Sequence, residues 1–541
     1  MTEYKKYIPL LLGIAAAFGV LLGSQLNFYD DSDRLFTSNS KKDKLNRLID
    51  YIDYEYVEEV NTDSIVDVTV NGILENLDPH TTYIPESEMQ RVRENMEGSF
   101  VGIGVQFHRY QDTITVIRTT KDGPSARAGI KAGDRILMAN KDSIQGSDFA
   151  KDSLVGKLKG KINSNVNLTV YRKSEDTILN FKVKRGRVPI KSVEAFFRIS
   201  PEVGYIKINR FAESTYDEFK YALETLIDQG ITKLTIDLRD NPGGYLGVTE
   251  EIVDEFLEKN KLILFTKNKR GKVEKKFATS RGLFETGELF ILINENSASA
   301  SEVIAGSLQD HDKGTIIGRR SYGKGLVQRE MGLGDGSAVR LTVSKYYTPT
   351  GRSIQKPYNK GDKSYFDDYI KRKRNGELVN ADNIVVDDSL KFTTPKGKVV
   401  YGGGGIIPDV FVPIDDFHDS ETMNYLERKG YFLYFTFKLI DNDRTTFEKL
   451  TATEFIENFK ISDSLFDDLR QSINYAENTN LTFNKYKSHM SMLLKAAMAE
   501  QLFDDNIAFK IRYRDDKMIQ EVLHLTNELG ISSGEEDAIQ D

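Results

Sequence analysis

Residues 289–328 constrain this chain more than any other stretch. An apolar run, Leu289–Ile293, leads through a polar turn into the small-residue string Ser297-Ala298-Ser299-Ala300-Ser301-Glu302. A second apolar run at 315–318 leads to Gly323-Lys324-Gly325-Leu326-Val327-Gln328. Two short apolar runs joined by a helical stretch predict the order strand, sharp turn, helix, strand. The pattern therefore places serines at a turn and returns a lysine toward them.

The residue types of this stretch suit nucleophilic catalysis. A serine hydroxyl is a weak nucleophile until a neighbouring base takes its proton. A lysine serves as that base when burial disfavours its charged form. In a strand, residues four apart share a face, so the amide of Gln328 is placed to hold the amine of Lys324. We expect a Ser-Lys dyad with an orienting glutamine.

The sequence alone leaves several alternatives open. Ser297, Ser299 and Ser301 are all candidate nucleophiles, and Ser299-x-x-Glu302 is also a capping box that starts a helix without any chemistry. A lysine such as Lys324, taken by itself, is more often a solvated surface residue. A Ser-His pair is disfavoured, because His311 would lie roughly 18 Å from Ser299 along a helix.

This stretch resembles the core of the C-terminal processing peptidases, the tail-specific family of serine proteases. The family signature is a Ser-Ala-Ser-Ala-Ser-Glu string followed by Gly-Lys-Gly-x-Val-Gln, and both are present. The resemblance implies Ser299 as the nucleophile, Lys324 as the base and Gln328 as the residue that orients it. It implies no metal and no cofactor.

The oxyanion site is expected at a second turn. Arg239-Asp240-Asn241-Pro242-Gly243-Gly244 follows a buried apolar run, and in the family the Asn-Pro-Gly-Gly turn supplies one oxyanion N–H. We therefore assign Gly243 and Gly244 to this site. The N–H of Ala300, directly after the implied nucleophile, is the natural second donor. Without the resemblance, the Pro-Gly-Gly sequence is equally an ordinary turn.

Residues 98–187 are β-rich and punctuated by glycines, and they resemble a PDZ domain. Gly102-Ile103-Gly104-Val105 opens a strand, and Gly123-Pro124 through Asp134-Arg135-Ile136 follow as turn, short helix and strand. In PDZ domains a glycine-containing loop binds the terminal carboxylate of a peptide that adds as an extra strand. We assign peptide binding to Ile103, Gly104 and Val105, against the alternative of a glycine-rich hairpin without a ligand.

Composition bounds the class of protein. The chain has 541 residues, enough for three or four domains, and a formal net charge of −8. The negative charge without a basic run disfavours nucleic acid as a partner. The absence of cysteine excludes disulfides, thiolate chemistry and cysteine-ligated zinc.

The N-terminal segment predicts a location. Lys5 and Lys6 precede the apolar run Ile8–Leu22, which is short for a membrane span but passable, or equally a signal peptide. We favour an uncleaved signal anchor, because no small-x-small cleavage site follows. The flanking lysines predict a translocated chain. We expect a bacterial cell-envelope protein, anchored in the inner membrane with its catalytic part in the periplasm, or secreted to the periplasm.

The domain prediction follows from these segments. We expect an α+β multidomain chain with a crotonase/ClpP-like α/β protease core, an inserted PDZ domain, a helical N-terminal region and a helical C-terminal extension. The predicted boundaries are: 1–28, signal anchor; 29–97, N-terminal helical region; 98–187, PDZ domain; 188–414, protease core with a charged surface insertion at 359–396; and 415–541, C-terminal helical domain.

The expected function is that of a serine endopeptidase acting near the C-termini of proteins. The PDZ domain would capture an accessible C-terminal tail and present it to the Ser-Lys site. Further expected partners are the membrane, a second copy of the chain or an adaptor protein. The alternatives are a non-catalytic PDZ scaffold and a crotonase-like acyl-CoA enzyme, which the intact Ser299, Lys324 and Gln328 disfavour.

Overall fold

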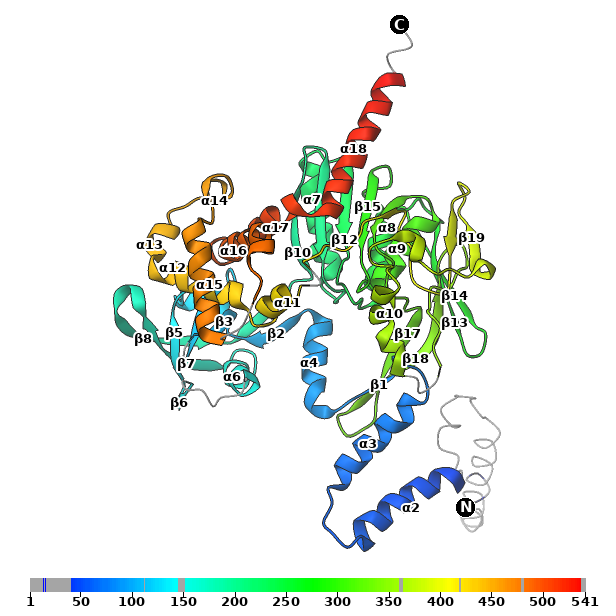
Figure 1. Ribbon diagram of the computed structural model, residues 1–541. Helices are drawn as coiled ribbons and strands as arrows, with labels where there is room; N and C mark the ends of the chain where they lie inside the picture. The colour runs from blue at the N-terminus through cyan, green and yellow to red at the C-terminus, as the bar shows by residue number, and fades with distance from the viewer. Residues whose placement is uncertain are drawn as a thin grey trace, which may run out of the picture. The chain divides into compact units, whose positions relative to one another are not determined.

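The chain is described by a computed structural model over residues 13, 15, 40–110, 112–144, 151–359, 363–417, 420–477 and 481–536 (Figure 1). It divides into two compact units, residues 1–74 and 75–541. Among the described helices, none combines the length and apolarity that crossing a bilayer requires. The predicted span at residues 8–22 lies outside the described residues, apart from Gly13 and Ala15.

The described part of the first unit contains two helices, within the N-terminal region expected to be helical. They are α2 (Ser40–Glu55) and α3 (Thr62–Glu75). Several large apolar side chains of these helices are exposed, among them Leu48 and Val68.

The centre of the second unit is a mostly parallel sheet in the order β10-β11-β12-β15-β16-β21. All neighbours along it are parallel except the edge pair β10 and β11. Parallel strands need crossover connections, and strands covered on both faces are apolar throughout, as the runs in this chain are. The strand bounds are: β10, Val193–Arg198; β11, Val203–Ile208; β12, Lys233–Asp237; β15, Glu288–Ile293; β16, Gly314–Gly318; β21, Val410–Phe411.

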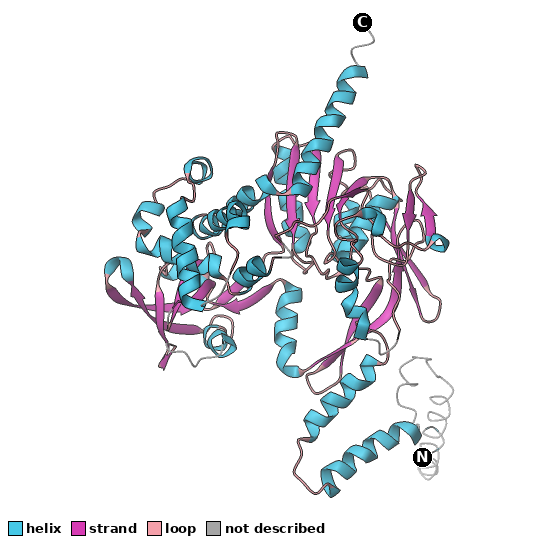
Figure 2. Cartoon of the chain, in the orientation of Figure 1, coloured by secondary structure: helices cyan, strands magenta, loops and turns pink. Residues whose placement is uncertain are grey.

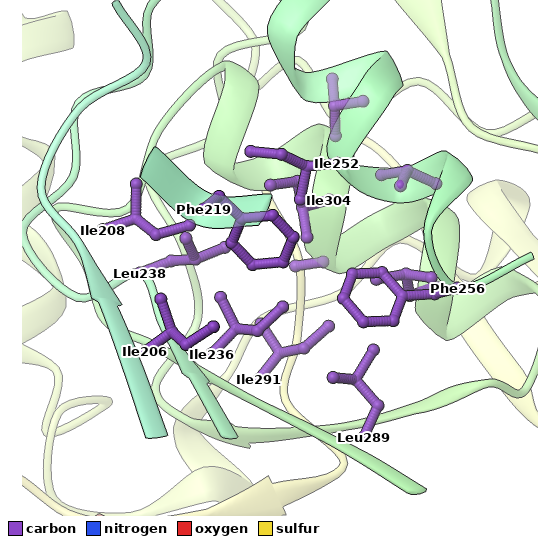
Figure 3. Packing of buried hydrophobic residues seen from close by; sticks show 14 of the residues in the cluster. Ile206, Ile208, Phe219, Ile236, Leu238, Ile252, Phe256, Leu289, Ile291 and Ile304 are labelled. Carbon is purple, nitrogen blue, oxygen red and sulfur yellow. The ribbon is translucent and has the colours of Figure 1, made fainter. Parts of the chain in front are cut away.

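Three helices pack on one face of this sheet, and they alternate with its strands along the chain: α7 (Thr215–Asp228), α8 (Leu246–Asp254) and α9 (Ala300–Asp310). Ile291 of β15 faces them, together with Phe219 and Ile304 from the helices (Figure 3). The alternate residues Phe290 and Leu292 face the other side, where they join a second cluster that includes residues of α18. The period of two along a strand explains this division.

A second, antiparallel sheet runs beside the central one in the order β1-β18-β13-β14, and β17 also pairs with β18. Its register places Thr82 opposite Arg340 and Gln328 opposite Thr342. The long strand β18 thus joins the start of the second unit to the strand that follows Lys324. The bounds are: β1, Thr82–Ile84; β13, Leu262–Asn268; β14, Val273–Phe277; β17, Leu326–Gly332; β18, Ala338–Tyr347.

The predicted PDZ segment forms a sheet of its own, in the order β3-β4-β5-β7-β8 with β6 on β5. The ribbon of β2 (Ser99–Gly102) and β9 (Gly186–Pro189) pairs the two ends of this segment. The remaining elements are: β3, Val105–Tyr110; β4, Thr113–Thr119; α5, Pro124–Ala128; β5, Arg135–Ala139; β6, Asp142–Ser143; α6, Lys151–Leu158; β7, Asn165–Arg172; β8, Thr177–Lys184.

The C-terminal region is helical over its described part, as the sequence periodicity predicts (Figure 2). Its apolar side chains form two clusters, around Phe435 and Leu469 and around Phe455 and Met498. The helix bounds are: α11, Glu421–Arg428; α12, Tyr431–Asn442; α13, Arg444–Phe447; α14, Ala452–Asn458; α15, Asp463–Glu477; α16, Lys487–Leu502; α17, Asp505–Arg512; α18, Lys517–Glu536.

The segment 359–396 differs in part from the expected surface insertion. It is irregular, with a short helix α10 (Asp368–Arg374) and small β19 (Lys391–Thr393) paired to β20 (Val399–Tyr401). Tyr365, Arg372 and Leu378 are nevertheless buried against the core. The charged composition of the segment did not predict this burial. The guanidinium of Arg372 is buried because it donates hydrogen bonds to Glu377 and to main-chain carbonyls inside the protein.

Candidate active site

Ser299 lies at the turn between β15 and α9, where it precedes the first helical residue. Its φ of 55° is in the left-handed region, which costs energy for a residue other than glycine. The neighbouring serines maintain this turn. Ser297 Oγ donates to Leu238 O at 2.8 Å, and Ser301 Oγ donates to Asn241 O at 2.9 Å. The structure thus commits two of the three candidate hydroxyls to the main chain of the adjoining turn.

Lys324 enters the site from the loop before β17. Its Nζ donates to Gln328 Oε1 at 2.9 Å, the pairing expected for residues four apart. The amide nitrogen of Gln328 donates in turn to the carbonyl of His80. Gln328 is therefore held from behind while its oxygen contacts the amine.

Glu302 holds the serine turn and the lysine loop together. Its Oε2 accepts from both Ser299 N and Lys324 N, each at 2.8 Å, so these two nitrogens cannot be further apart than the sum of those distances. Its Oε1 accepts from Ser321 Oγ at 2.5 Å and from Gly323 N at 2.7 Å. The side chain is fully buried. The same Ser299-x-x-Glu302 spacing that reads as a helix start thus also fixes the backbone of the candidate base.

A tyrosine of β18 completes this connection. Tyr346 Oη lies 2.8 Å from Lys324 O and 3.1 Å from Ser299 O, so its single proton is shared between the two carbonyls. The ring is buried, with 2% of its surface exposed. The two loops are therefore joined twice, once through their N–H groups and once through their carbonyls.

The surroundings of Lys324 favour its neutral form. Burial lowers the pKa of the Lys324 amine from its ordinary value, and the positive charge of Arg340 lowers it further. Glu302 and Asp78 act in the opposite direction with smaller effects on this pKa. A lowered pKa increases the neutral fraction of the lysine, and the neutral amine is the form that a general base needs.

The proposed oxyanion residues lie against the serine turn. A side-chain carbon on Gly243 would come within 2.9 Å of Ser299 Cβ and 3.0 Å of Ala300 N. The N–H of Gly243, however, donates to Asn241 Oδ1 at 2.9 Å. The N–H groups of Gly244 and Ala300 have no acceptor among the described residues. Gly244 and Ala300 are thus the free donors, while Gly243 provides the close approach.

The PDZ loop residues are distant in sequence from these loops. Gly104 has a φ of 70°, and its carbonyl accepts from Thr120 N, while the carbonyl of Ile103 accepts from Ser125 N at 2.9 Å. Val105 begins β3, which is an edge strand in the described sheet. An edge strand is the element to which a peptide adds as a further strand.

The turn Asp78-Pro79-His80-Thr81 supports Gln328, although its sequence by itself indicates only the end of a helix. Asp78 accepts from the N–H groups of His80 and Thr81 at 2.9 and 3.0 Å, and Thr342 donates to it from β18. The carbonyl of His80 is thereby placed to hold Gln328. Burial, followed by the charge of Lys324, lowers the pKa of His80 to about 4, so this imidazole is neutral at neutral pH. Pro79 and the threonines Thr81 and Thr82 are the features of the sequence that mark this turn.

Family models match three parts of the chain. Peptidase family S41 matches residues 202–362, a PDZ domain matches residues 101–184, and a family of unknown function matches residues 422–504. A serine-type peptidase with a PDZ domain is therefore the class that sequence and fold define. The first of these matches contains Ser299, Lys324 and Gln328.

Curated relatives narrow the class. A carboxy-terminal-processing protease of Bartonella bacilliformis is 33% identical over 347 residues, which are 62% of this chain and 78% of that protein. The carboxy-terminal processing protease CtpB of Bacillus subtilis is 32% identical over 329 residues, 60% of this chain and 67% of that protein. The chain belongs to the family of carboxy-terminal processing proteases, which confirms the resemblance drawn from the motifs.

Among solved structures, one titled photosystem II D1 C-terminal processing protease is 23% identical and has a TM-score of 0.36. The match covers 68% of this chain and 86% of that one.

Proposed function

We propose that this peptidase cleaves proteins near their C-termini with Ser299 as nucleophile, Lys324 as general base and Gln328 as the residue that orients the base. The observation that carries the proposal is the shared acceptor Glu302 Oε2, which binds the main-chain nitrogens of Ser299 and Lys324 together. We further propose that the protease core has the crotonase/ClpP-like fold predicted from the sequence. We also propose the domain boundaries 1–28, 29–97, 98–187, 188–414 and 415–541.

The reaction follows from the donors and acceptors of the site. A neutral lysine amine has one lone pair, and Gln328 Oε1 accepts one of its N–H groups, so the lone pair is left for the hydroxyl of Ser299. Lys324 takes the serine proton as Oγ attacks the peptide carbonyl, and the oxyanion is stabilised by the N–H groups of Gly244 and Ala300. The Lys324 ammonium then protonates the leaving amine, which leaves an acyl-enzyme.

Hydrolysis uses the same groups a second time. Lys324, neutral again after the amine departs, takes a proton from water as the water oxygen attacks the acyl carbonyl. The ammonium returns this proton to Ser299 Oγ as the ester bond breaks. The free serine and the new carboxylic acid are the products, and water is the one further reactant that the balance needs.

The PDZ domain supplies the substrate tail in this proposal. The tail's carboxylate would bind the loop of Ile103, Gly104 and Val105, and its last residues would add to β3. β3 lies at the edge of its sheet, which supports this assignment. Accessible C-terminal tails of proteins and peptides are the substrate class that follows.

The cellular setting is a further part of the proposal. The relatives named above come from bacteria, which agrees with a bacterial origin. Anchoring in the inner membrane with the catalytic part in the periplasm stays a prediction, as do a second copy or an adaptor as partner. Residues 8–22, on which the anchor depends, lie outside the described residues.

The test compares intact masses of casein fragments produced by the wild-type chain and by Ser299→Ala. We expect wild type to remove C-terminal fragments and the variant to remove none, with unchanged melting of the protein. Ser297→Ala and Ser301→Ala are informative neighbours, since their hydroxyls bind main-chain carbonyls and should affect stability more than chemistry. Fragments released equally by Ser299→Ala would refute the nucleophile, and no cleavage by wild type would favour a PDZ scaffold.

A further inference from the structure

Tyr365 comes from the irregular segment 359–396, yet it lies beside the turn that holds Gln328. Its Oη is 2.9 Å from His80 Nε2, and the two rings meet edge to face with centroids 5.3 Å apart. Only 6% of its surface is exposed. A residue outside the family's motif strings is therefore packed against the support of the candidate base.

Two chains of hydrogen bonds from the lysine loop converge on this hydroxyl. One runs from Lys324 Nζ through the side chain of Gln328 to the carbonyl of His80, whose ring contacts Tyr365. The other runs from Gly325 N to Gln355 Oε1 at 2.8 Å, and Gln355 Nε2 donates to Tyr365 Oη at 3.2 Å. One route fixes the amine of residue 324, and the other fixes the main chain next to it.

The donor is fixed at one of the two contacts of this hydroxyl. Gln355 Nε2 donates to the oxygen of Tyr365. The contact between Tyr365 Oη and His80 Nε2 is made by either tautomer of a neutral imidazole, because a phenol oxygen both donates and accepts. The burial of His80 beside two lysines favours the neutral ring.

Lys356 fills the far side of the same cluster. Its Nζ lies 3.9 Å from the ring centroid of Tyr322 and 4.3 Å from that of Tyr365, and 3.3 Å from Asp368 Oδ2. With 6% of its surface exposed, it closes the back of the aromatic group. Tyr365 is thus held by its ring as well as by its hydroxyl.

We propose that Tyr365 is a positioning residue for the Ser-Lys site: its hydroxyl joins the Gln328–His80 route to the Gln355–Gly325 route and so fixes the amine and the main chain of the base loop together. This inference depends on the proposed Ser-Lys function. It assigns the described residues 363–396 a part in supporting the active site, through contacts of Tyr365 with His80 and Gln355.

The test is Tyr365→Phe, which removes one oxygen and keeps the ring between His80 and Lys356. We expect kcat for casein cleavage at neutral pH to fall about three- to tenfold, the equivalent of one net hydrogen bond, with little change in KM. The acid limb of the pH–rate profile should move to higher pH. A less firmly held Lys324 amine is better hydrated, which raises its pKa and stabilises its protonated form. The charged or titratable groups facing that amine are Arg340, Glu302, Asp78 and His80.

Tyr358→Phe is the matched control, since its ring also packs edge to face on Tyr365 at 6.2 Å. We expect its kcat and pH profile to equal those of wild type. A Tyr365→Phe profile that coincides with wild type, or a loss confined to KM, would overturn the proposal. Wild type that cleaves nothing would instead overturn the proposed function.

A double variant separates positioning from general loosening. Gln355→Leu removes the second route, and we expect Tyr365→Phe combined with it to lose less activity than the product of the two single losses. Losses that multiply, at unchanged melting temperature, would show that the two routes do not meet at this hydroxyl and would contradict the inference.

Discussion

At the scale of single residues, the buried carboxylate of Glu302 decides the geometry of the site. It accepts four hydrogen bonds, from Ser299 N, Lys324 N, Gly323 N and Ser321 Oγ, and no cation neutralises it at hydrogen-bond distance within the described chain. A buried anion is tolerable when donors surround it in this way. Three of the donors are main-chain N–H groups of the serine turn and the lysine loop, and the fourth is the hydroxyl of Ser321, so the charge is satisfied only when these loops are in place.

Glu302→Gln tests this function of the carboxylate. The amide would turn an NH2 group toward N–H donors, which removes at least one hydrogen bond and adds a repulsion. We expect stability to fall by about 2–4 kcal/mol and kcat by at least about a hundredfold. Denaturant unfolding and casein cleavage measure the two effects. Glu258→Gln, on an exposed glutamate, is the control, and a fully active Glu302→Gln enzyme would contradict the account.

The pH dependence belongs to the same scale. Because burial and Arg340 lower the pKa of Lys324, its neutral form is reached at lower pH than in a free lysine, and that form is lost as pH falls through this pKa. We expect kcat/KM to fall on acidification as Lys324 becomes protonated. Protonation of His80 should affect the rate only near its pKa of about 4. Lys324→Arg should be inactive at every pH, since a guanidinium keeps its proton. A rate that stays flat on mild acidification would contradict a lysine base.

At the scale of elements, β18 links the two catalytic loops through Tyr346. Tyr346→Phe removes the hydroxyl that contacts Lys324 O and Ser299 O. We expect activity to fall roughly tenfold and stability by about 1–2 kcal/mol, because two buried carbonyls lose a donor. Tyr347→Phe is the control on the next residue, whose ring stacks on Phe265. Cleavage rates and thermal melts compare the two, and equal behaviour would remove Tyr346 from the account.

The turn after β12 has a strict backbone requirement. Gly244 has a φ of 154°, and a side-chain carbon there would come within 2.0 Å of Phe211 O. Gly244→Ala must therefore displace the turn that carries a free N–H, and we expect a loss of about 2 kcal/mol or more together with most of the activity. Gly247→Ala in α8 meets nothing within 4 Å and should be neutral or slightly stabilising. Unfolding curves that rank the two variants the other way would refute this.

Much of this arrangement was predictable from the sequence. The apolar runs before Asn241 and before Ser297 form the strands β12 and β15, and the residues after Ser299 form α9. These elements were predictable because the local sequence pattern and the burial of the residues agree. His311 lies at the far end of that helix, where its Nε2 contacts Leu262 O, so it is remote as predicted. The connections of Tyr346 and Tyr365 were not predictable, since they depend on contacts between residues 10 to 285 positions apart in sequence.

At the scale of the second unit, the C-terminal helices contact the outer face of the PDZ sheet. Asp441 Oδ2 lies 3.1 Å from Arg135 and 2.9 Å from Lys173, and Tyr434 stacks on Tyr110 with ring centroids 5.2 Å apart. Helix α18 meanwhile packs Met518, Ile519 and Val522 on the central sheet. The region thus contacts both domains that the proposed reaction needs.

Asp441→Asn should loosen this contact. The side chain of Asp441 is 7% exposed and faces two cations, and removing its charge leaves the partly buried Arg135 with the rings of Tyr110 and Tyr171 but without this acidic partner. We expect faster hydrogen exchange in β5 and β7, equivalent to about 2–3 kcal/mol of local stability. Asp416→Asn, at an 87% exposed side chain of the same region, is the control. Unchanged exchange in both variants would show that this charge does not hold the two domains together.

The most direct measurement is the rate at which a fluorophosphonate modifies the purified chain at neutral pH, with the adduct located by mass spectrometry. The account predicts a single adduct on the hydroxyl of Ser299 in wild type, and none in a Lys324→Ala variant that melts normally. Equal labelling of wild type and Lys324→Ala, or an adduct on another serine, would contradict it.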